Sequence, residues 1–434
     1  MNITFIGCGY VGLVSGTVMS HLGHNVVCLD TDQTKIAKLN SGISPIYETD
    51  LDKYLQQSIK SERLKFTYNY DAELATAEAV FITVGTPSLP SGEADLTYVF
   101  DVIDKICNWI SKDCLLVIKS TVPPTSCNKI IDYLAEKNFT FNVASNPEFL
   151  REGTAVKDFL APDRIIVGVN NKKSEEIIRK IYLPLIDQNI PLVVTDLVTS
   201  ELIKYASNSF LATKISYINE MANLCEKTGA NIKDLAFGMG LDQRIGAQFL
   251  NAGPGFGGSC FPKDILALRA LAENYQTDCK ILDAVIDSNR GRPFKMVDKI
   301  SNLLGNELSG KNITILGLTY KAGTDDIRDS PAIEIIKNLL IKGAYIKAFD
   351  PVGLDNAQKY FENENLLYLK SAIEACAQAD AIVITTEWLE FNELDWIVIY
   401  KSVKSPIIID LRNLLDAETV KAAGFEYYGI GRGG

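Results

Sequence analysis

The residue whose type and setting most directly suggest chemistry is Cys260, within the stretch GPGFGGSCFPKD at positions 253–264. Glycines have no Cβ, so they let a backbone take strained dihedral angles and approach a ligand closely. Pro262 suits the first turn of a helix that continues through Lys263 and Asp264, which places the thiol at a helix N-terminus. There the unpaired N–H groups and the helix dipole favour the nucleophilic thiolate. The stretch predicts either a catalytic thiol or a glycine-rich turn around a buried Cys, which usually behaves as a small apolar residue.

The composition argues against several other classes of protein. Among 434 residues, 43 Lys and Arg stand against 54 Asp and Glu, and the net charge of −11 disfavours binding to nucleic acid or to anionic membranes. The chain opens in a strand-like run without a leader pattern, and no apolar run reaches a spanning length, so we expect a cytoplasmic protein. The nine cysteines are scattered without a C-x-x-C pair, which supports neither a disulfide framework nor a zinc site, and no metal is expected. With two histidines, His21 and His24, acid–base work falls to Lys, Asp, Glu or Cys.

The N-terminus has the layout of a dinucleotide-binding unit. A strand at residues 2–6 runs into Gly7, Gly9 and Gly12, which complete G-x-G-x-x-G, and a helical pattern and a second strand at 25–29 follow. Such glycines allow a tight turn and close approach to a pyrophosphate, and the helix N-terminus favours its charge. Asp30, at the end of the second strand, suits the ribose hydroxyls of NAD and would repel the 2′-phosphate of NADP.

The same rhythm continues to about residue 194. Strand-like runs at 80–84, 115–118, 141–144, 164–169 and 192–194 alternate with helical patterns, which is typical of a doubly wound parallel sheet. Polar residues follow three of these strands, at 85–87 with Thr86, at 120–124 with Thr121, and at 146–153. Each has an alternative explanation as turn chemistry alone, but we expect all three at the ligand-binding edge of the sheet.

A long segment from about Asp196 to Thr228 lacks Gly and Pro and predicts one long helix, able to link two domains and to offer a flank to a second subunit. Lys204 and Asn208, four residues apart, share one face of it. They are either an exposed polar stripe or part of a site that includes the Cys260 loop.

The strand and helix pattern restarts near Ile313. Strands at 313–316 and 345–349 flank a helix at 331–341, and Asp350 ends the second strand, but GLTYKAGTDDIRDSP replaces the phosphate-binding glycines. We therefore expect a similar fold without a second NAD site. Lys321, Arg328 and Arg412 fall at its loop ends, where they are either diphosphate ligands or solvated surface charge.

Taken together, the motifs resemble one family. They are GCGYVG, STVPP, NPEFLREG, ELIKYASNSFLATKISYINE, RIG, GFGGSCFPKD, GLTYKAGTDDIRDSP and DLRN, in this order over essentially the whole chain. The set resembles the bacterial UDP-glucose 6-dehydrogenases of the UDP-glucose/GDP-mannose dehydrogenase family. The resemblance implies an α/β fold with two Rossmann-like, doubly wound parallel-sheet domains joined by a long central helix and a small helical domain. Residues 1–196 would bind NAD, 197–300 would dimerise and carry the Cys loop, and 301–434 would bind the UDP-sugar.

The motifs and the resemblance also imply residue roles. The implied catalytic residues are Cys260 as nucleophile with Lys204, Asn208, Asp264, Glu148 and Thr121. The implied cofactor contacts are Gly7, Gly9, Val11, Gly12, Asp30, Lys35, Thr86, Thr121, Glu152, Lys263 and Arg328. The implied substrate contacts are Glu148, Phe149, Leu150, Arg151, Glu152, Lys204, Asn208, Arg244, Phe249, Leu250, Asn251, Ala252, Gly253, Gly257, Lys321 and Arg412. Arg244 matches a residue that reaches the substrate from a neighbouring subunit in some members.

The chain departs from the family pattern at two places. Thr49 and Asp50 stand where many relatives have Pro-Gly, which affects a local turn, and Phe256 stands where many have Tyr, which removes one hydroxyl. Neither departure touches the implied catalytic set.

The implied reaction has its own chemical logic. Oxidation of a primary alcohol to a carboxylate needs two hydride transfers, and a thiolate can hold the intermediate aldehyde as a thiohemiacetal, become a thioester and then be released by water. Lys204 and Asn208 would stabilise the oxyanion, Asp264 or a water that it holds would take the first proton, and Glu148 would orient the hydrolytic water. The sequence leaves the first base open. It also leaves two alternatives, a dehydrogenase of GDP-mannose or of a UDP-N-acetyl sugar, and an NAD-binding protein without catalysis.

Overall fold

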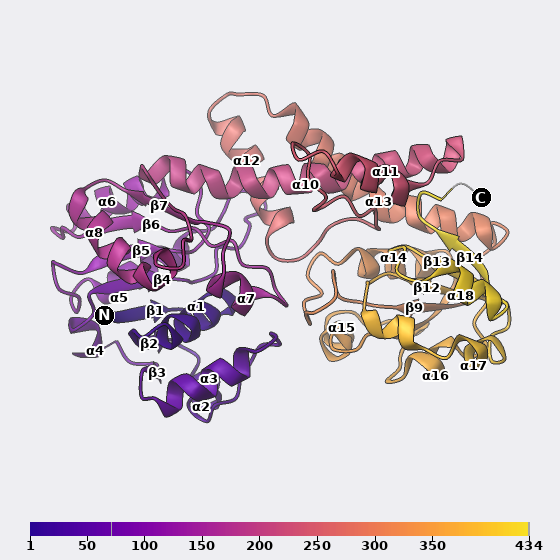
Figure 1. Cartoon of the computed structure of the whole chain (residues 1–434), viewed down its shortest axis with the longest axis horizontal. Coiled ribbons are helices and arrows are strands. Elements are labelled where there is room, and N and C mark those ends of the chain that lie inside the picture. Colours follow the sequence, from indigo (N-terminus) through magenta and orange to yellow (C-terminus); the bar gives the residue numbers. More distant parts are fainter. Residues whose placement is uncertain (71, 433–434) are drawn as a thin grey trace. The chain divides into compact units, whose positions relative to one another are not determined.

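The computed structural model describes residues 1–70 and 72–432, and the chain packs as two units (Figure 1). The first unit comprises Met1–Ser207 together with Ala270–Gln276. The second comprises Asn208–Arg269 and the chain from Thr277 onward. The three-domain division expected from the sequence stays a prediction.

The first unit is built on an eight-stranded sheet with the strand order β3-β2-β1-β4-β5-β6-β7-β8. The strands are β1 Asn2–Ile6, β2 Asn25–Leu29, β3 Leu64–Thr67, β4 Ala79–Ile82, β5 Leu115–Ile118, β6 Asn142–Ser145, β7 Ile165–Val169 and β8 Leu192–Thr195. The order reverses between β1 and β4, which is the switch point where ligands bind in doubly wound sheets.

One pair of strands in this parallel sheet runs the other way. β6 and β7 run antiparallel, with Ala144 opposite Val169, whereas β7 and β8 are parallel to each other. The reason lies in the connection from β6, which ends in the short helix α7 (Ala155–Leu160) packed against α1 (Tyr10–His21). This connection stays at the edge of the sheet where β6 ends, so the chain re-enters the sheet from that edge rather than from the opposite one.

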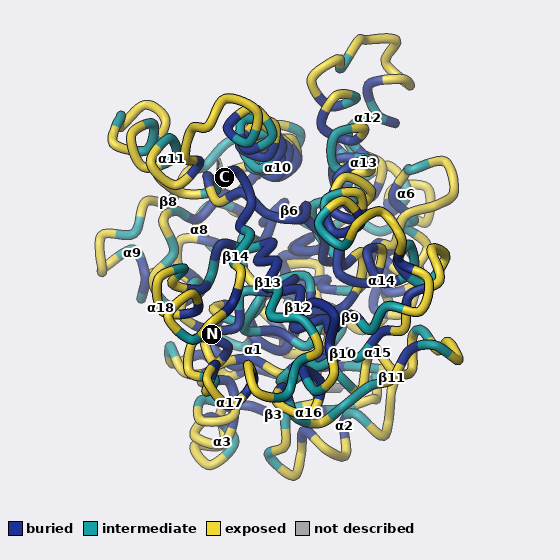
Figure 2. The backbone as a smooth tube through the Cα atoms, turned by 90° about the vertical axis from the view of Figure 1, so that its right-hand side faces the viewer, coloured by how far each residue is buried: buried dark blue, intermediate teal, exposed yellow. Residues whose placement is uncertain are grey.

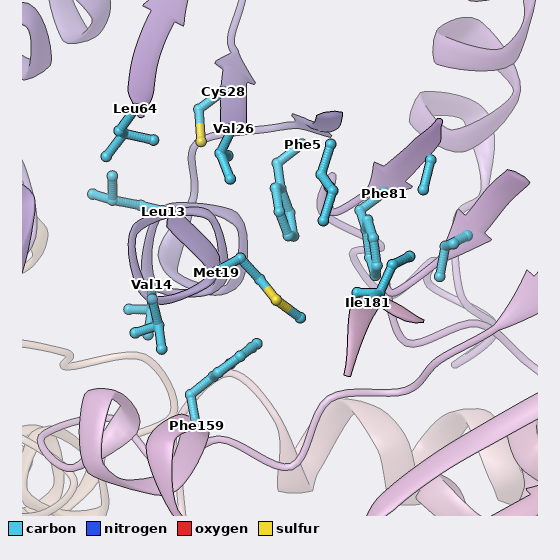
Figure 3. Packing of buried hydrophobic residues seen from close by; sticks show 14 of the residues in the cluster. Phe5, Leu13, Val14, Met19, Val26, Cys28, Leu64, Phe81, Phe159 and Ile181 are labelled. Atoms are coloured by element: carbon cyan, nitrogen blue, oxygen red, sulfur yellow. The ribbon is translucent and has the colours of Figure 1, made fainter. Parts of the chain in front are cut away.

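Helices cover both faces of the first sheet. The others in this unit are α2 Gln33–Asn40, α3 Leu51–Lys60, α4 Ala72–Ala75, α5 Thr97–Ile106, α6 Ser126–Glu136, α8 Lys172–Ile181 and α9 Leu183–Ile186. One buried cluster joins one face to α1, α2, α3, α7 and α8, and another joins the opposite face to α5 and α6. Figure 3 shows the first cluster, in which the rings of Phe5 and Phe81 stack at a centroid distance of 4.7 Å near Met19 of α1. Burial on both faces explains the almost continuous apolar strands and confirms the doubly wound fold.

The helix α10 (Leu197–Thr228) has 32 residues and confirms the long helix expected from the sequence. At 1.5 Å per residue it is about 48 Å long. Its N-terminal turns belong to the first unit, where the buried Glu201 accepts hydrogen bonds from the backbone N–H groups of Thr125 and Cys127 at the start of α6. From Asn208 onward the helix belongs to the second unit.

The second unit is built on a six-stranded sheet with the strand order β11-β10-β9-β12-β13-β14, in which all neighbouring strands are parallel. The strands are β9 Asn312–Leu316, β10 Tyr345–Phe349, β11 Leu366–Tyr368, β12 Ala381–Ile384, β13 Ile407–Asp410 and β14 Glu426–Gly429. The helices are α11 Ile232–Gly240, α13 Lys280–Leu303, α14 Pro331–Ile341, α15 Leu354–Tyr360, α16 Ala372–Cys376, α17 Trp396–Tyr400 and α18 Ala417–Ala422, with a 3-10 turn at Leu389–Glu393. The helix α12 (Phe261–Asn274) begins in this unit, and its residues from Ala270 belong to the first. Figure 2 shows β9, β12 and β13 as buried segments beneath exposed outer helices.

The second sheet repeats the central hydrogen bonds of the first. Gly7 and Gly317 both have a φ of 101°, and each donates its N–H to the last residue of the neighbouring strand, Leu29 or Phe349. The carboxylate that follows this strand also accepts the N–H of the residue after the glycine in both sheets, from Cys8 to Asp30 at 2.8 Å and from Leu318 to Asp350 at 2.7 Å. The two sheets differ because Asp350 is buried and accepts in addition the Trp388 indole at 3.1 Å. The carboxylate of the second sheet is thus engaged inside the protein.

The departure at Thr49 and Asp50 puts a non-glycine residue at a position with a positive φ. Asp50 precedes α3 with a φ of 63°, in the left-handed region that favours glycine. Asp is among the side chains that tolerate this region best. The turn therefore forms although the chain lacks the Pro-Gly expected from the family pattern.

Within residues 1–70 and 72–432, no helix combines the length and the apolar character that crossing a membrane requires.

Candidate active site

The first βα turn of the first unit has the geometry of a pyrophosphate-binding loop. A Cβ on Gly12 would lie 1.9 Å from the carbonyl oxygen of Gly7, so only glycine allows this close packing, whereas a Cβ on Gly9 would meet no atom within 4 Å. No side chain caps the N-terminus of α1, and Val11 lies in its first turn. The unpaired N–H groups of such a helix end suit an anion, so these residues fit a dinucleotide.

The predicted pair Asp30 and Lys35 is brought together at the end of β2. The Asp30 carboxylate accepts hydrogen bonds from Lys35 Nζ at 2.8 Å, from the Cys8 N–H at 2.8 Å and from the Asp32 N–H at 3.0 Å. Burial by itself would raise the pKa of Asp30, but these donors lower it overall. An ionised carboxylate beside the glycine loop is what the ribose hydroxyls of NAD need, and it disfavours a 2′-phosphate.

The polar strand ends predicted to share one edge do so. The ends of β4, β5 and β6 are neighbours in parallel register. Thr86, after β4, donates its hydroxyl to the backbone oxygen of Thr121, after β5, at 2.8 Å. This bond fixes two of the predicted cofactor contacts relative to each other.

Glu148 and Lys204 form a buried ion pair in the first unit, with Lys204 Nζ 3.1 Å from Glu148 Oε1 and both side chains about 5% exposed or less. The other carboxylate oxygen accepts the N–H of Leu150 at 2.6 Å. The centroid of the Phe149 ring lies 5.1 Å from Lys204 Nζ and 4.0 Å from the Arg164 guanidinium. A buried charge pair held by these contacts has a fixed geometry, which is the property a catalytic group needs.

The rest of the NPEFLREG stretch is held by two carboxylates. Arg151 makes a two-point pair with Asp158, at 3.0 and 2.6 Å, and its side chain is more than half exposed. The buried Glu48 accepts the N–H groups of Gly153 and Ala155 at 2.7 and 2.8 Å, which places the predicted contact Glu152 beside an anchored turn. Glu48 was not among the predicted residues.

Cys260 immediately precedes α12, as its sequence setting predicted. Its backbone oxygen accepts the N–H of Asp264 at 2.9 Å, and its sulfur lies 3.6 Å from the hydroxyl of Ser259. Cys260 and Cys279 are partly exposed, whereas the other seven cysteines are buried. Cys260 therefore combines access to solvent with a helix start, the setting that favours a reactive thiolate.

Asn208, Lys263 and Asp264 are brought together in the second unit. The Asp264 carboxylate, 1% exposed, accepts the Asn208 amide at 2.6 Å and Lys263 Nζ at 2.6 Å. Lys204, which pairs with Glu148, and Asn208, which bonds Asp264, lie one turn apart on α10.

The predicted substrate loop at 249–253 is fastened by residues that the sequence reasoning missed. The Gly253 N–H donates to Asn219 Oδ1 at 2.8 Å, and the Gly253 oxygen accepts Arg292 Nε at 2.9 Å. Arg292 is buried, and burial lowers its pKa to about 10. Asn289 bonds both the N–H and the oxygen of Phe256, at 2.9 and 3.0 Å. The sequence held one signal for Asn219. It lies eleven residues after Asn208, which is about three helical turns, so both side chains lie on the same face of α10.

Backbone geometry in this loop is restricted. Phe249 has a φ of 64°, which is an outlier for an aromatic residue and marks a conformation that its surroundings impose. Leu250 and Ala252 are buried, while Asn251 is exposed.

The glycines before Cys260 lie against the GLTYKAGTDDIRDSP stretch. A Cβ on Gly257 would lie 2.1 Å from the Asp329 oxygen, and one on Gly258 would lie 2.7 Å from the ring of Tyr320. The Gly258 N–H donates to the Arg328 oxygen at 2.8 Å. These contacts explain why the Cys260 loop requires glycines.

The predicted basic residues of the second unit differ in their roles. Arg412 donates to the backbone oxygens of Thr385 and Tyr320 at 2.9 and 2.8 Å, and its Nη1 would lie 3.2 Å from a Cβ on Gly253. Lys321 lies 5.7 Å from the Tyr320 ring centroid. Arg328 and Arg244 each pair with an acid two residues earlier, Asp326 or Asp242, and their side chains are 63% and 88% exposed. Arg412 is thus brought beside the predicted substrate loop, whereas Arg244 points to solvent.

The first unit has a dinucleotide-binding fold, and the comparisons with known proteins identify the chain as an NAD-dependent dehydrogenase. The chain matches the NAD binding, central and UDP binding domains of the UDP-glucose/GDP-mannose dehydrogenase family at residues 1–186, 198–291 and 314–417. It belongs to this family.

Several named relatives are similar over their whole length. The chain is 70% identical to a UDP-glucose 6-dehydrogenase of Rickettsia bellii, with 99% of each chain covered. It is 45% identical to a UDP-glucose 6-dehydrogenase of Rhizobium meliloti, with 100% of each covered. Among solved structures, a UDP-glucose dehydrogenase from Pyrobaculum islandicum is 34% identical with a TM-score of 0.91, over 100% of this chain and 98% of that one.

Proposed function

We propose that this protein oxidises the 6-hydroxymethyl group of UDP-glucose to the carboxylate of UDP-glucuronate, in two steps and with NAD. The single observation that carries the proposal is the partly exposed Cys260 at the start of α12, four residues before a buried carboxylate that is bonded to Asn208. The 70% identity to a UDP-glucose 6-dehydrogenase supports the choice of substrate.

The cofactor fits the first unit. Bound NAD would accept one hydride in each of the two oxidations. The chain's own contribution is the glycine loop and the N-terminus of α1 for the diphosphate, and Asp30 with Lys35 for the ribose. Thr86 and Thr121, fixed by their mutual hydrogen bond, flank the same edge of the sheet.

Cys260 holds the carbon between the two oxidations. Its thiolate forms a C–S bond to the aldehyde carbon, and the aldehyde oxygen becomes the oxyanion of a thiohemiacetal. The second oxidation converts this adduct into a thioester. Water then adds to the thioester carbon, the C–S bond breaks, and the carboxylate leaves while the thiolate is restored. The covalent bond keeps the aldehyde from escaping.

The surrounding polar groups handle charge and protons. Lys204 as an ammonium and Asn208 as an amide donor would stabilise the oxyanion, since both lie on α10 one turn apart. Asp264, or a water that it holds, would take the proton of the alcohol, and Glu148 would orient the water that cleaves the thioester. This assignment requires that the Glu148–Lys204 pair and the Asn208–Asp264 pair serve one substrate.

The residues that bind the sugar nucleotide would distinguish this enzyme from dehydrogenases of other sugar nucleotides. Arg412, Lys321 and the anchored loop at 249–253 are the groups proposed to bind the UDP-sugar in the second unit.

The absorbance of NADH tests the choice of substrate, with UDP-glucose, GDP-mannose and UDP-N-acetylglucosamine supplied in turn with NAD. Turnover of UDP-glucose well above the other two is expected, and a preference for either of the others would reassign the substrate.

We propose a homodimer formed through α10, in a cytoplasmic enzyme with functional segments at 1–196, 197–300 and 301–434. Three large side chains on α10, Phe210, Tyr217 and Leu224, are 66%, 48% and 54% exposed. Their spacing of seven residues puts them on one stripe of the helix, the pattern of a helix seam. An exposed apolar stripe on the helix of the central segment is complementary to its own copy.

Glu in place of Tyr217 should dissociate this dimer, because each copy would bury a carboxylate in the apolar interface. Sedimentation should give about twice the chain mass of 47.8 kDa for the unaltered protein and about one chain mass for Tyr217→Glu. Ile341→Glu, at an 82% exposed position at the end of α14, is the matched control and should leave the mass unchanged. A Tyr217→Glu protein with the unaltered mass would place the interface elsewhere.

A further inference from the structure

A second lysine is buried close to the Glu148–Lys204 pair, and the proposed chemistry does not use it. Lys119 is the first residue after β5 and is 4% exposed. Its ammonium donates to Asn146 Oδ1 at 3.1 Å and lies 5.6 Å from the centroid of the Phe159 ring. Its hydrogen-bond partner is thus a neutral amide and not a carboxylate. A buried cation bonded in this way has a large desolvation free energy that no opposite charge at hydrogen-bond distance offsets.

Asn146 connects Lys119 to the segment that carries Glu148. β5 and β6 pair in parallel with Ile118 opposite Ser145, so Lys119 and Asn146 follow side by side. The Asn146 amide oxygen also accepts the Tyr182 hydroxyl at 2.5 Å, and its amide nitrogen donates to the Ile166 oxygen at 2.9 Å. Glu148 is two residues further along the chain, in the same segment after β6.

Charge links Lys119 to the same pair. Burial lowers the pKa of Lys119 from 10.5 to about 8, while Glu148 acts to raise it and Lys204 to lower it. The titratable groups around Lys119 are therefore Glu148 from the turn after β6, Lys204 from α10 and Tyr182 from the end of α8. Burial raises the pKa of Tyr182, so this phenol stays neutral in the range where Lys119 titrates.

We propose that Lys119 is a positioning residue, which fixes the segment from Asn146 to Glu148 by its hydrogen bond and places a second positive charge beside the Glu148–Lys204 pair. The proposal rests on the proposed function, in which Glu148 and Lys204 act on the substrate. Two ammonium groups and one carboxylate leave a net positive charge in a buried cluster. That charge favours the oxyanion that Lys204 would stabilise.

The cluster loses this charge when Lys119 loses its proton. Above about pH 8 the cluster becomes neutral, and stabilisation of the oxyanion weakens. Catalysis should therefore depend on pH through a residue that does not contact the substrate.

Kinetics of Lys119→Met test the inference. The variant keeps the length of the side chain but has neither charge nor donor, so kcat should fall about tenfold at pH 7. The ratio of wild-type to variant kcat should then shrink to about twofold by pH 9.5, because the wild type loses the same charge. Tyr182→Phe is the matched control, since it removes a hydrogen bond to the same Asn146 oxygen without changing charge. Its ratio to the wild type should be independent of pH.

Lys119→Arg gives the converse result. A guanidinium stays charged to well above pH 10, so this variant should keep most of the wild-type kcat at pH 7 and lack the decline near pH 8. A constant wild-type to Lys119→Met ratio between pH 7 and 9.5 would overturn the proposal. So would a Lys119→Arg profile that declines as the wild-type profile does, and this second arm remains decisive where Lys119→Met does not fold.

A stability measurement separates failure of this inference from failure of the proposed function. The folded-state pKa of Lys119 lies below its ordinary value, so the unfolded chain binds more protons between about pH 8 and 10.5, and this group's contribution to stability rises with pH over that window. The Tm of Lys119→Met minus that of the wild type should therefore decrease from pH 7.5 to pH 10. An unaltered protein that forms no NADH from UDP-glucose would refute the proposed function, whereas a Tm difference independent of pH would refute the buried charge.

Discussion

Cys260→Ser is expected to bind UDP-glucose and NAD almost as the unaltered protein does while steady-state turnover falls by several orders of magnitude. Serine has nearly the same shape, but its hydroxyl ionises far less readily than a thiol, so the ester forms poorly and hydrolyses slowly once formed. The first oxidation should suffer less, because it needs only a base, the cofactor and a positioned alcohol. Intact mass spectrometry should then detect a covalent sugar adduct on the variant.

Cys279→Ser is the matched control for this prediction, because Cys279 is the other partly exposed cysteine. Its turnover should match that of the unaltered protein. Alkylation of the unaltered protein should label Cys260 first and should be slowed by UDP-glucose. Near-normal conversion by Cys260→Ser would make Cys260 a packing residue and would remove the covalent step from the account.

Asp264→Asn is the second substitution with a large expected effect. The Asp264 carboxylate is buried between Asn208 and Lys263, at 2.6 Å from each, and an amide of the same shape cannot take a proton from the alcohol. Loss of a positioned general base typically costs about 10²- to 10⁴-fold in rate. We expect kcat to fall by that factor with a smaller change in KM, measured from initial rates of NADH formation.

The control for Asp264→Asn is Asp283→Asn, which alters an exposed carboxylate of α13 that pairs with Arg269 at 2.7 Å. Surface pairs of this kind contribute little, so its kcat should be unchanged. If Asp264→Asn lost only binding of UDP-glucose and kept its kcat, Asp264 would act on the substrate's position and not on its proton.

Most of the elements that position the site could be predicted from local patterns. The G-x-G-x-x-G between two apolar runs predicted the first βα turn, and the lack of Gly and Pro between 196 and 228 predicted α10. Pro262 predicted the helix start that follows Cys260. These signals are strong because each depends on a few neighbouring residues and on backbone preferences that tertiary packing reinforces.

The remaining features depend on contacts between distant parts of the chain. The reversal at β7 follows from the packing of α7 on α1, which no periodicity records. Glu48, Arg292 and Lys119 are charged residues, and charged residues usually remain at the surface, yet each is buried and holds a loop of the proposed site. Sequence spacing gives no sign of such burial, because the partners lie far away along the chain.

The central claim is that one cofactor site and one thiol carry out both oxidations of one sugar. The measurement that tests it most directly is the amount of NADH formed when a limiting, known amount of UDP-glucose is consumed to completion with excess NAD. The account predicts about two NADH per UDP-glucose, with UDP-glucuronate as the product and no aldehyde in solution. One NADH per UDP-glucose, with the aldehyde accumulating, would contradict it.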